Sequence, residues 1–267
     1  MELIDPCPPP LWGGQGFLPF QGRMSNSNPE TNALKRNPTV HTTPTHIIFV
    51  RGPLSNWHPS TPFRGQRALD LCLPKLDELG IEYPARNAAV TRLIGSWDFT
   101  CGEQWMMGMK AWLFEGLPFF DSDKGISEEE FTELRRVVGP SKAPRGEKEK
   151  AILESSVIKV LRAREPRVQK AIGRRVDGFR EEVWSVASEA VVTAGCIARA
   201  EVDGSLKALY LASEGRGFVE GSVRDCVWGV GLKWDGIEIE DERNWRGENR
   251  LGRCHDEAAR VVRRGLV

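Results

Sequence analysis

A long stretch of helical periodicity constrains the fold of this chain more than any other feature. Between residues 180 and 200, apolar side chains recur every three or four positions, so they share one face of a helix. Such a face is stabilised mainly by packing against other elements. The core is therefore expected to form around helices, with this face contributing Val183, Trp184, Ala187, Ala190, Val191 and Ala194.

Shorter patterns predict a strand and a second helix. The β-branched run at 46–50 predicts a strand that ends before Pro53, because proline cannot continue a ladder. A helix is expected over 68–79, ending at Gly80 in a left-handed cap. Pro74 favours a break or a late start in that helix.

Helices are expected to dominate the rest of the chain as well. Further helical patterns cover 205–212 and 249–264, whereas 218–232 is expected to be strand or loop. We find no internal repeat in the sequence. The sequence therefore predicts an α+β fold that is mainly helical, as a single compact domain with a few short strands.

The start of the chain differs in composition from the remainder. Residues 1–44 are rich in Pro, Gly, Asn, Ser and Thr and are expected to be a disordered tail, which leaves 45–267 as the folded domain. Between 133 and 180, fourteen Lys or Arg stand against six Asp or Glu. Such an excess is typical of a solvated insertion, and less often of a surface that faces phosphates.

Composition argues against several classes of protein. Thirty-seven Lys+Arg balance thirty-seven Asp+Glu, which removes bulk attraction to DNA or anionic membranes. The sequence has no run of about 18 apolar residues, so no membrane-spanning helix is expected. The six cysteines form no CxxC pair, the four histidines lack ligand spacing, and no secretory leader pattern is present. We therefore expect no metal site, reduced thiols, and a cytoplasmic or nuclear location.

Residues 100–114 form the most informative segment. Apolar residues at 105, 109, 112 and 113 predict a helix face in the core. On a neighbouring face, Glu103 and Lys110 lie two turns apart, about 10 Å along the axis at 1.5 Å per residue. A gap of that size could hold a sugar ring.

Each of these residues also has a structural interpretation. Thr100 followed by Glu103 has the form of a capping box, in which the carboxylate bonds the backbone instead of doing chemistry. A single lysine on a helix is most often solvated. Trp105 and Met106 are more often core residues than a platform for a ligand.

Six segments together resemble the NADAR family, also called YbiA-like. They occur in the family's order and span about residues 46 to 264, with extra length near 65–98 and 138–165. The segments are LSNWHP at 54–59, EQWMM at 103–107 with Lys110, Ala111 and Phe114, AIGRRVDGF at 171–179 with Trp184, VE at 219–220, DCVWGVGL at 225–232, and WRGENRLG at 245–252.

The resemblance implies an N-glycosidase that needs no cofactor. Family members cleave the base–ribose bond of riboflavin-pathway pyrimidine intermediates or remove ADP-ribose from modified guanine. The implied partner is a small nucleotide-like substrate, which could be carried on ADP-ribosylated nucleic acid. The resemblance implies no membrane partner. The implied catalytic residues are Lys110, Glu103 and Asp225, and the implied substrate-binding residues are Asn56, Trp57, Trp105, Met106, Arg175, Trp228, Gly229 and Asn249.

The chemistry gives these residue types a reason. Breaking a C–N bond at an anomeric carbon builds positive charge on the sugar, which a carboxylate can stabilise or an amine can capture covalently. An attacking amine must be neutral, so Lys110 needs a lowered pKa, which the side chains at 105, 106, 107 and 114 could supply by desolvation. Asp225 could activate water or bind ribose, and Trp228 could stack on the base.

Alternatives remain open for the later motifs. Asp225 could cap a turn and Trp228 could be a core residue. Asn249 precedes a helix whose free amides could bind a phosphate, or it is a plain N-cap. Arg175 and its neighbour Arg174 could contact phosphate or be solvated.

One departure from the family and two other functions complete the expectations. Arg199-Ala200 stands where many relatives carry Lys-Phe, which keeps the charge and loses the aromatic ring. A module that binds ADP-ribose or NAD without cleaving it is the main alternative to an enzyme. A third possibility is that the basic stretch 133–180 docks an acidic or nucleic-acid partner.

Overall fold

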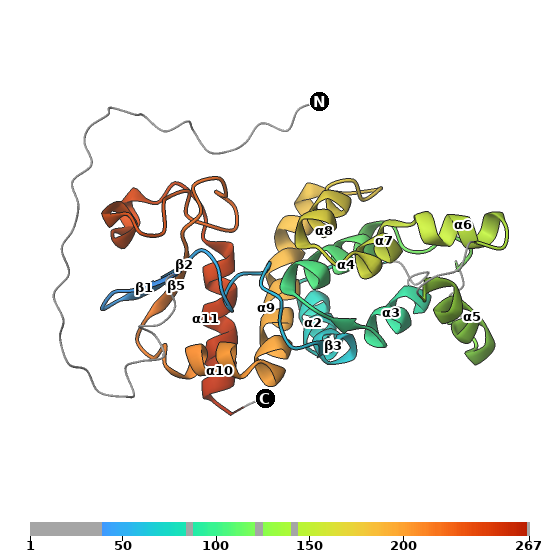
Figure 1. Ribbon diagram of the computed structural model, residues 1–267, viewed down its shortest axis with the longest axis horizontal. Helices are drawn as coiled ribbons and strands as arrows, with labels where there is room; N and C mark the ends of the chain where they lie inside the picture. Colours follow the sequence, from blue (N-terminus) through green and yellow to red (C-terminus); the bar gives the residue numbers. More distant parts are fainter. Residues whose placement is uncertain (1–38, 84–87, 121–124, 140–143, 266–267) are drawn as a thin grey trace. The chain divides into compact units, whose positions relative to one another are not determined.

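The computed structural model describes residues 39–83, 88–120, 125–139 and 144–265. Contacts divide the chain into two compact units. The sheet unit comprises residues up to Gly52 together with Ser213–Arg253, and the helical unit comprises Pro53–Ala212 together with the chain from Cys254 onward. Figure 1 shows the elements of both units, and each unit is described by itself.

The sheet unit contains a three-stranded mixed sheet in the order β1-β2-β5. β1 pairs antiparallel with β2, with Val40 opposite Phe49, and β2 pairs parallel with β5, with His46 opposite Gly217. One face packs a small apolar core that includes Ile48 and Val219. The strands are β1 Val40–Thr42, β2 His46–Phe49 and β5 Gly217–Glu220, and two short 3₁₀ helices follow, η3 Ile237–Glu240 and η4 Glu242–Asn244.

The helical unit holds most of the described helices and one two-stranded antiparallel sheet, β3 Phe63–Arg64 with β4 Asp98–Phe99. Helix α11, Arg250–Arg263, begins in the sheet unit and continues into this one. The other helices are α2 Gly65–Glu78, α3 Ala88–Gly95, α4 Gly102–Phe114, α5 Glu128–Val138, α6 Glu147–Glu154, α7 Ser156–Arg162, α8 Pro166–Gly173, α9 Glu181–Val202 and α10 Gly204–Leu211.

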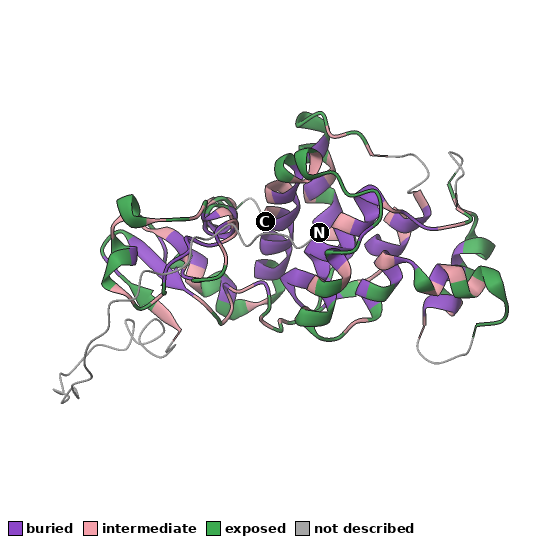
Figure 2. Cartoon of the chain, turned by 90° about the horizontal axis from the view of Figure 1, so that it is seen from above, coloured by how far each residue is buried: buried purple, intermediate pink, exposed green. Residues whose placement is uncertain are grey.

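Helix α4 lies at the centre of the helical unit. All of its residues except Lys110 are buried, and it packs most extensively against α7, α8 and α9. A helix that is apolar nearly all round has to be surrounded in this way. Figure 2 shows the buried residues concentrated in the middle helices of this unit and the exposed ones on its outer turns.

Two glycines let the neighbouring helices approach α4 closely. A Cβ atom at Gly195 of α9 would lie 2.5 Å from Cδ1 of Trp105, and one at Gly173 of α8 would lie 2.0 Å from Sδ of Met107. The indole N–H of Trp105 donates to the carbonyl of Val191, 2.7 Å away. Close helix packing therefore fixes the rotation of α4 about its own axis.

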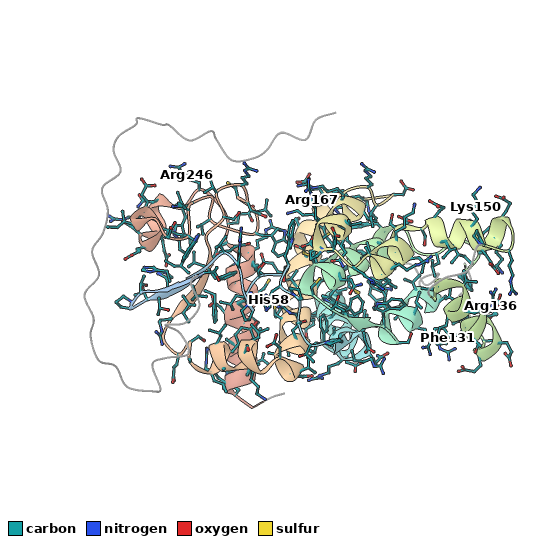
Figure 3. The ribbon with its side chains drawn as sticks, viewed as in Figure 1. His58, Phe131, Arg136, Lys150, Arg167 and Arg246 are labelled. Atoms are coloured by element: carbon teal, nitrogen blue, oxygen red, sulfur yellow. The ribbon has the colours of Figure 1, made fainter. Side chains whose placement is uncertain are left out.

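Helices α5 and α6 lie at one end of the helical unit (Figure 1). Their facing surfaces are joined by Arg136, which bonds Glu133 on its own helix and Glu149 on α6 (Figure 3). Ser127 and Glu130 form a capping box at the start of α5. Local polar contacts therefore define this pair of helices.

Most of the expected elements are present. The mainly helical α+β class is confirmed, as are the strand at 46–49 and the three helices expected near 180–200, 205–212 and 249–264. Gly80 has a φ of 66°, as a left-handed cap requires. The expected break at Pro74 is wrong, because α2 runs through Pro74 while Leu69, Cys72 and Leu76 on either side of it are buried in the core.

Two boundaries differ from expectation. β1 lies within the stretch assigned to the disordered tail, because its backbone pairs with β2; residues 1–38 lie outside the described chain. The basic stretch 133–180 is not simply a solvated insertion. Helices α7 and α8 lie within it, and both pack against α4. Their buried residues are Val157, Ile158, Val160, Leu161, Gln169 and Gly173.

The expectation of reduced thiols holds for four cysteines. Cys72, Cys101, Cys196 and Cys254 are free and buried. Burial raises the pKa of Cys72 to about 12 and that of Cys196 to about 11, so both stay protonated at neutral pH. Cys226 is disulfide-bonded, and the expectation is wrong there.

In the part of the chain that the structure describes, no helix is both long and apolar enough to cross a membrane.

Gly195→Ala is expected to destabilise the protein. The new methyl group would collide with the indole of Trp105, 2.5 Å away, and an overpacked core typically costs about 1–3 kcal/mol. Urea unfolding measures the loss. Gly204→Ala is the control, since no atom lies within 4 Å of the added Cβ there. Equal stability of the two variants would contradict the close packing of α9 on α4.

Candidate functional site

A tryptophan and a buried carboxylate form the first part of the site. Trp57 follows the loop Pro53–Asn56, and its indole N–H donates to Oε2 of Glu103, 3.1 Å away. Glu103 lies in the first turn of α4 and is only 2% exposed, whereas Trp57 is 43% exposed. The carboxylate is therefore held from one side by a ring whose other side is open to a ligand.

The structure overturns the capping-box interpretation of Glu103. The N-cap of α4 is Cys101, which makes no side-chain cap bond. It is Gln104 that reaches back, with Oε1 accepting from the backbone N–H of Thr100 at 3.0 Å. The backbone N–H of Glu103 donates to the carbonyl of Asn56 at 2.9 Å. The Glu103 carboxylate is thus not used to cap its own helix.

Lys110, two turns further along α4, lies among aromatic rings. Its Nζ is 3.7 Å from the ring centroid of Phe179 and 5.8 Å from that of Trp184. Phe114 backs both rings, with edge-to-face contacts at 5.4 Å to Phe179 and 6.4 Å to Trp184. Rings from the start of α9 and the loop before it therefore enclose the amine.

This environment lowers the pKa of Lys110 to about 8. Burial is the largest cause, and the positive charge of Arg174 adds to it, while Glu103 and Glu181 act in the opposite direction. A substantial fraction of the amine is therefore neutral near pH 8. The lowering expected from the sequence is present, but the rings nearest the amine come from 179 and 184 rather than from α4 itself.

Three of the predicted ligand contacts on the α4 side have structural roles. Trp105 is 0% exposed and its indole N–H is used by Val191, so it is a core residue and not a ligand platform. Met106 is 5% exposed and is also largely enclosed. Asn56 is buried, and its backbone carbonyl accepts from Glu103. Only Trp57 of the predicted set in this region has a broad open face.

Two neighbouring arginines have different surroundings. Arg174, the C-cap of α8, acts on Lys110 through its charge. Arg175 instead lines a separate hollow of about 520 Å³ with Lys159, Arg167 and Asp177. The sequence selected Arg175 for substrate binding, but the arginine whose charge lowers the pKa of the candidate catalytic lysine is Arg174.

The remaining predicted residues lie in the sheet unit. Oδ1 of Asp225 accepts from the backbone N–H groups of Val227 at 3.2 Å and Trp228 at 2.8 Å, which forms a turn. A Cβ at Gly229 would lie 2.8 Å from the carbonyl of Glu220, so only glycine fits there. Trp228 is partly exposed. The turn holds this loop in one shape and leaves the Trp228 ring accessible.

Both the oxygen and the nitrogen of the Asn249 side chain bond the backbone. Asn249 donates to the carbonyl of Phe218 at 2.9 Å and accepts from the N–H of Glu220 at 3.0 Å, with a φ of 54°. The amides of residues 248–251 all donate to carbonyls of 226–229. The phosphate site expected at the start of this helix is therefore not available, because those amides already have acceptors.

The helical unit thus brings Trp57, Glu103 and Lys110 into one cluster. Lys170 adds a further positive charge, 5.8 Å from the Trp57 ring. Sequence reasoning missed Phe179 as a neighbour of the lysine, although Gly178-Phe179 stood in the recognised segment. Among the described residues, no group of three or more His, Cys, Asp and Glu is arranged to hold a metal.

Comparisons with known proteins agree with the expected family. The family model for the NADAR domain matches residues 146–263. Protein irg-1 of Caenorhabditis elegans is 32% identical over 100 residues, which is 37% of this chain and 47% of that protein. N-glycosidase R617 of Acanthamoeba polyphaga mimivirus is 31% identical over 84 residues, 32% of this chain and 49% of that protein.

The chain spans about half the length of the curated relatives it matches. Among solved structures, it is similar to the Escherichia coli protein YbiA determined by NMR, with 18% identity and a TM-score of 0.44 over 88% of this chain and 92% of that one.

Arg174→Gln is expected to raise the pKa of Lys110. Removing a nearby positive charge stabilises the protonated amine, which raises its pKa by roughly a few tenths of a unit for a partly solvated pair. NMR of ¹³C-methylated lysines across a pH titration measures this. Arg175→Gln is the matched control and should leave the Lys110 titration unchanged. A rise in the control alone would show that the assignment of the two arginines is reversed.

Proposed function

Because residues 146–263 carry a NADAR domain, we propose that the protein is an N-glycosidase that hydrolyses the bond between a base and a ribose. The observation that carries the proposal is the pairing of a buried carboxylate, Glu103, with a lysine whose pKa is lowered to about 8 on the same helix. The name of the viral relative, an N-glycosidase, supports the same reaction class.

The two groups match what the reaction needs. The neutral Nζ of Lys110 forms a bond to the anomeric carbon while the C–N bond to the base breaks and its electron pair leaves with the base nitrogen. The attacking amine becomes positively charged and loses a proton to the Glu103 carboxylate, which passes that proton to the leaving base nitrogen. Water then displaces the lysine from the sugar, so that the sugar gains a hydroxyl and the lysine regains its proton as a neutral amine.

A second route uses the same residues without a covalent step. Glu103 stabilises the oxocarbenium-like sugar and orients water, while Lys110 binds the substrate as a cation. The two routes differ in the protonation state required of Lys110. Only the covalent route requires a neutral amine.

The other parts of the site would bind the substrate. Trp57 offers a partly open ring on which a base could stack, and stacking by Trp228 stays a prediction from the sequence. Lys170 and Arg174 supply positive charge for a phosphate. We propose a phosphorylated ribosyl substrate, either a ribosylaminopyrimidine phosphate or an ADP-ribosylated guanine, free or carried on nucleic acid. A role for Asp225 as an acid or base stays a prediction from the sequence.

Lys110→Ala is expected to reduce base release by at least about 100-fold with the fold intact, since a single positioned catalytic group contributes on that order or more. The wild-type rate should rise with pH and level off above about 8, because deprotonation supplies the attacking amine. Mass spectrometry of the released base, with a panel of both substrate classes, measures the rate. A rate that falls through this range would favour the cationic role of Lys110.

Borohydride treatment during turnover is expected to trap the covalent route. If the lysine-bound sugar opens to an imine, reduction fixes the sugar to Lys110, and peptide mass spectrometry locates it. Lys110→Arg is the matched control, because guanidinium stays protonated and cannot attack. An active enzyme that never gives an adduct would support the route through water.

A panel without any product would point to the alternative function. Calorimetric binding of ADP-ribose or NAD by the folded protein, without base release from any substrate, would identify a ligand-binding module instead of an enzyme.

A further inference from the structure

Arg199 is a fully buried charged residue that the proposed chemistry does not use. It lies on α9 with 0% of its surface exposed. The adjoining helix sequence, Ala190 to Ala198, carries no other charged side chain. Burying a guanidinium costs free energy that its hydrogen bonds must offset, so its contacts identify what it stabilises.

The contacts of Arg199 lead to the loop that carries Trp57. Nη2 of Arg199 donates to the carbonyl of Pro53 at 2.7 Å and lies 3.5 Å from that of Ser55. Nη1 lies close to the start of α4, 3.1 Å from where a Cβ of Gly102 would be. Arg199 therefore spans the space between the loop and the helix that bears Glu103.

His255 is a second buried donor, and it binds the carbonyl of Leu54, which lies between Pro53 and Ser55. Nε2 of His255, on α11, is 2.6 Å from the carbonyl of Leu54, and Nδ1 is 2.6 Å from the hydroxyl of Tyr210. A carbonyl can only accept, so Nε2 carries the proton and Nδ1 accepts from the tyrosine. Burial and the charge of Arg199 lower the pKa of His255 to about 3, which keeps this neutral form at all ordinary pH values.

Every carbonyl from Pro53 to Asn56 thus has a donor. Arg199 donates to the carbonyls of Pro53 and Ser55. His255 donates to that of Leu54, and the backbone N–H of Glu103 to that of Asn56. Burial and the charge of Arg199 also lower the pKa of His58, just after the loop. Four successive carbonyls bound by three separate helices leave the loop little freedom.

We propose that Arg199 and the His255–Tyr210 pair are positioning residues that hold the Pro53–Asn56 loop so that the Trp57 indole stays bonded to Glu103. Neither touches the reacting groups. Their effect passes through the loop backbone to the one described tryptophan that bonds this carboxylate. The consequence for turnover rests on the proposed function, whereas the positioning itself does not.

The Trp57 indole N–H signal in a ¹H–¹⁵N NMR spectrum of the full-length protein tests the proposal without any substrate. Trp57→Phe assigns the signal, and Glu103→Gln shows how far it depends on the carboxylate. Arg199→Met is expected to abolish the downfield shift that the bond to Glu103 causes, and Tyr210→Phe to reduce it. Arg199→Lys, which keeps the charge on a single donor nitrogen, should restore part of it.

Controls separate positioning from loss of fold. The indole signal of Trp112, bonded to Thr91 at 2.7 Å, should stay unchanged in every variant. Arg136→Met removes another arginine, one that bonds Glu133 and Glu149 on α5 and α6, and should leave Trp57 unchanged. If Arg199→Met does not fold, Arg199→Gln replaces it, because the shorter amide cannot bridge Pro53 and Ser55.

The outcomes are distinct from those of the function test. A Trp57 signal that keeps its wild-type position in a folded Arg199→Met or Arg199→Gln variant overturns the proposal, whether or not the protein is an enzyme. A lost shift together with inactive wild-type protein upholds the positioning and refutes the glycosidase. With an active wild type, positioning predicts that Arg199→Met lowers kcat more than it raises KM.

Discussion

The burial of α4 is the constraint on which the rest of the candidate site depends. Because α7, α8 and α9 enclose this helix, the carboxylate of Glu103 is removed from bulk water and the amine of Lys110 is partly removed from it. Removal from water costs free energy for each charge, and this cost appears as the lowered pKa of Lys110. A solvated helix with the same two residues would give an ordinary surface pair with no reactivity of note.

Some of the residues around α4 stabilise its packing, and others set the protonation state of its lysine. Gly173 and Gly195 permit close helix packing, and Trp105, which the sequence assigned to a ligand, secures that packing through its bond to Val191. Phe179 and Arg174 set the state of the lysine. In the sheet unit, the side chains of Asp225 and Asn249 bond the backbone, although the sequence predicted Asp225 as catalytic and Asn249 as substrate-binding.

Sequence reasoning recovered the elements better than the roles of their residues. The periodic stripes of α9, α10 and α11 predicted those helices, since one apolar face is enough to identify a helix. The spacing of Glu103 and Lys110 placed them on one helix face, which is a local property, and the family resemblance then named them as catalytic. Arg175, Trp105 and Asn249 were selected by the company of their motifs, and a motif does not reveal which of its polar atoms the backbone already uses.

The sequence by itself determined the helical class, the place of α4 in the core and the common face of Glu103 and Lys110, because these follow from periods of three to four residues. Only the tertiary structure decided what surrounds that face. Trp57 lies 46 positions before Glu103, and the rings of Phe179 and Trp184 lie about 70 positions beyond Lys110. The pKa of a lysine and the bond of a carboxylate depend on such distant neighbours, whose approach is set by packing and not by spacing along the chain.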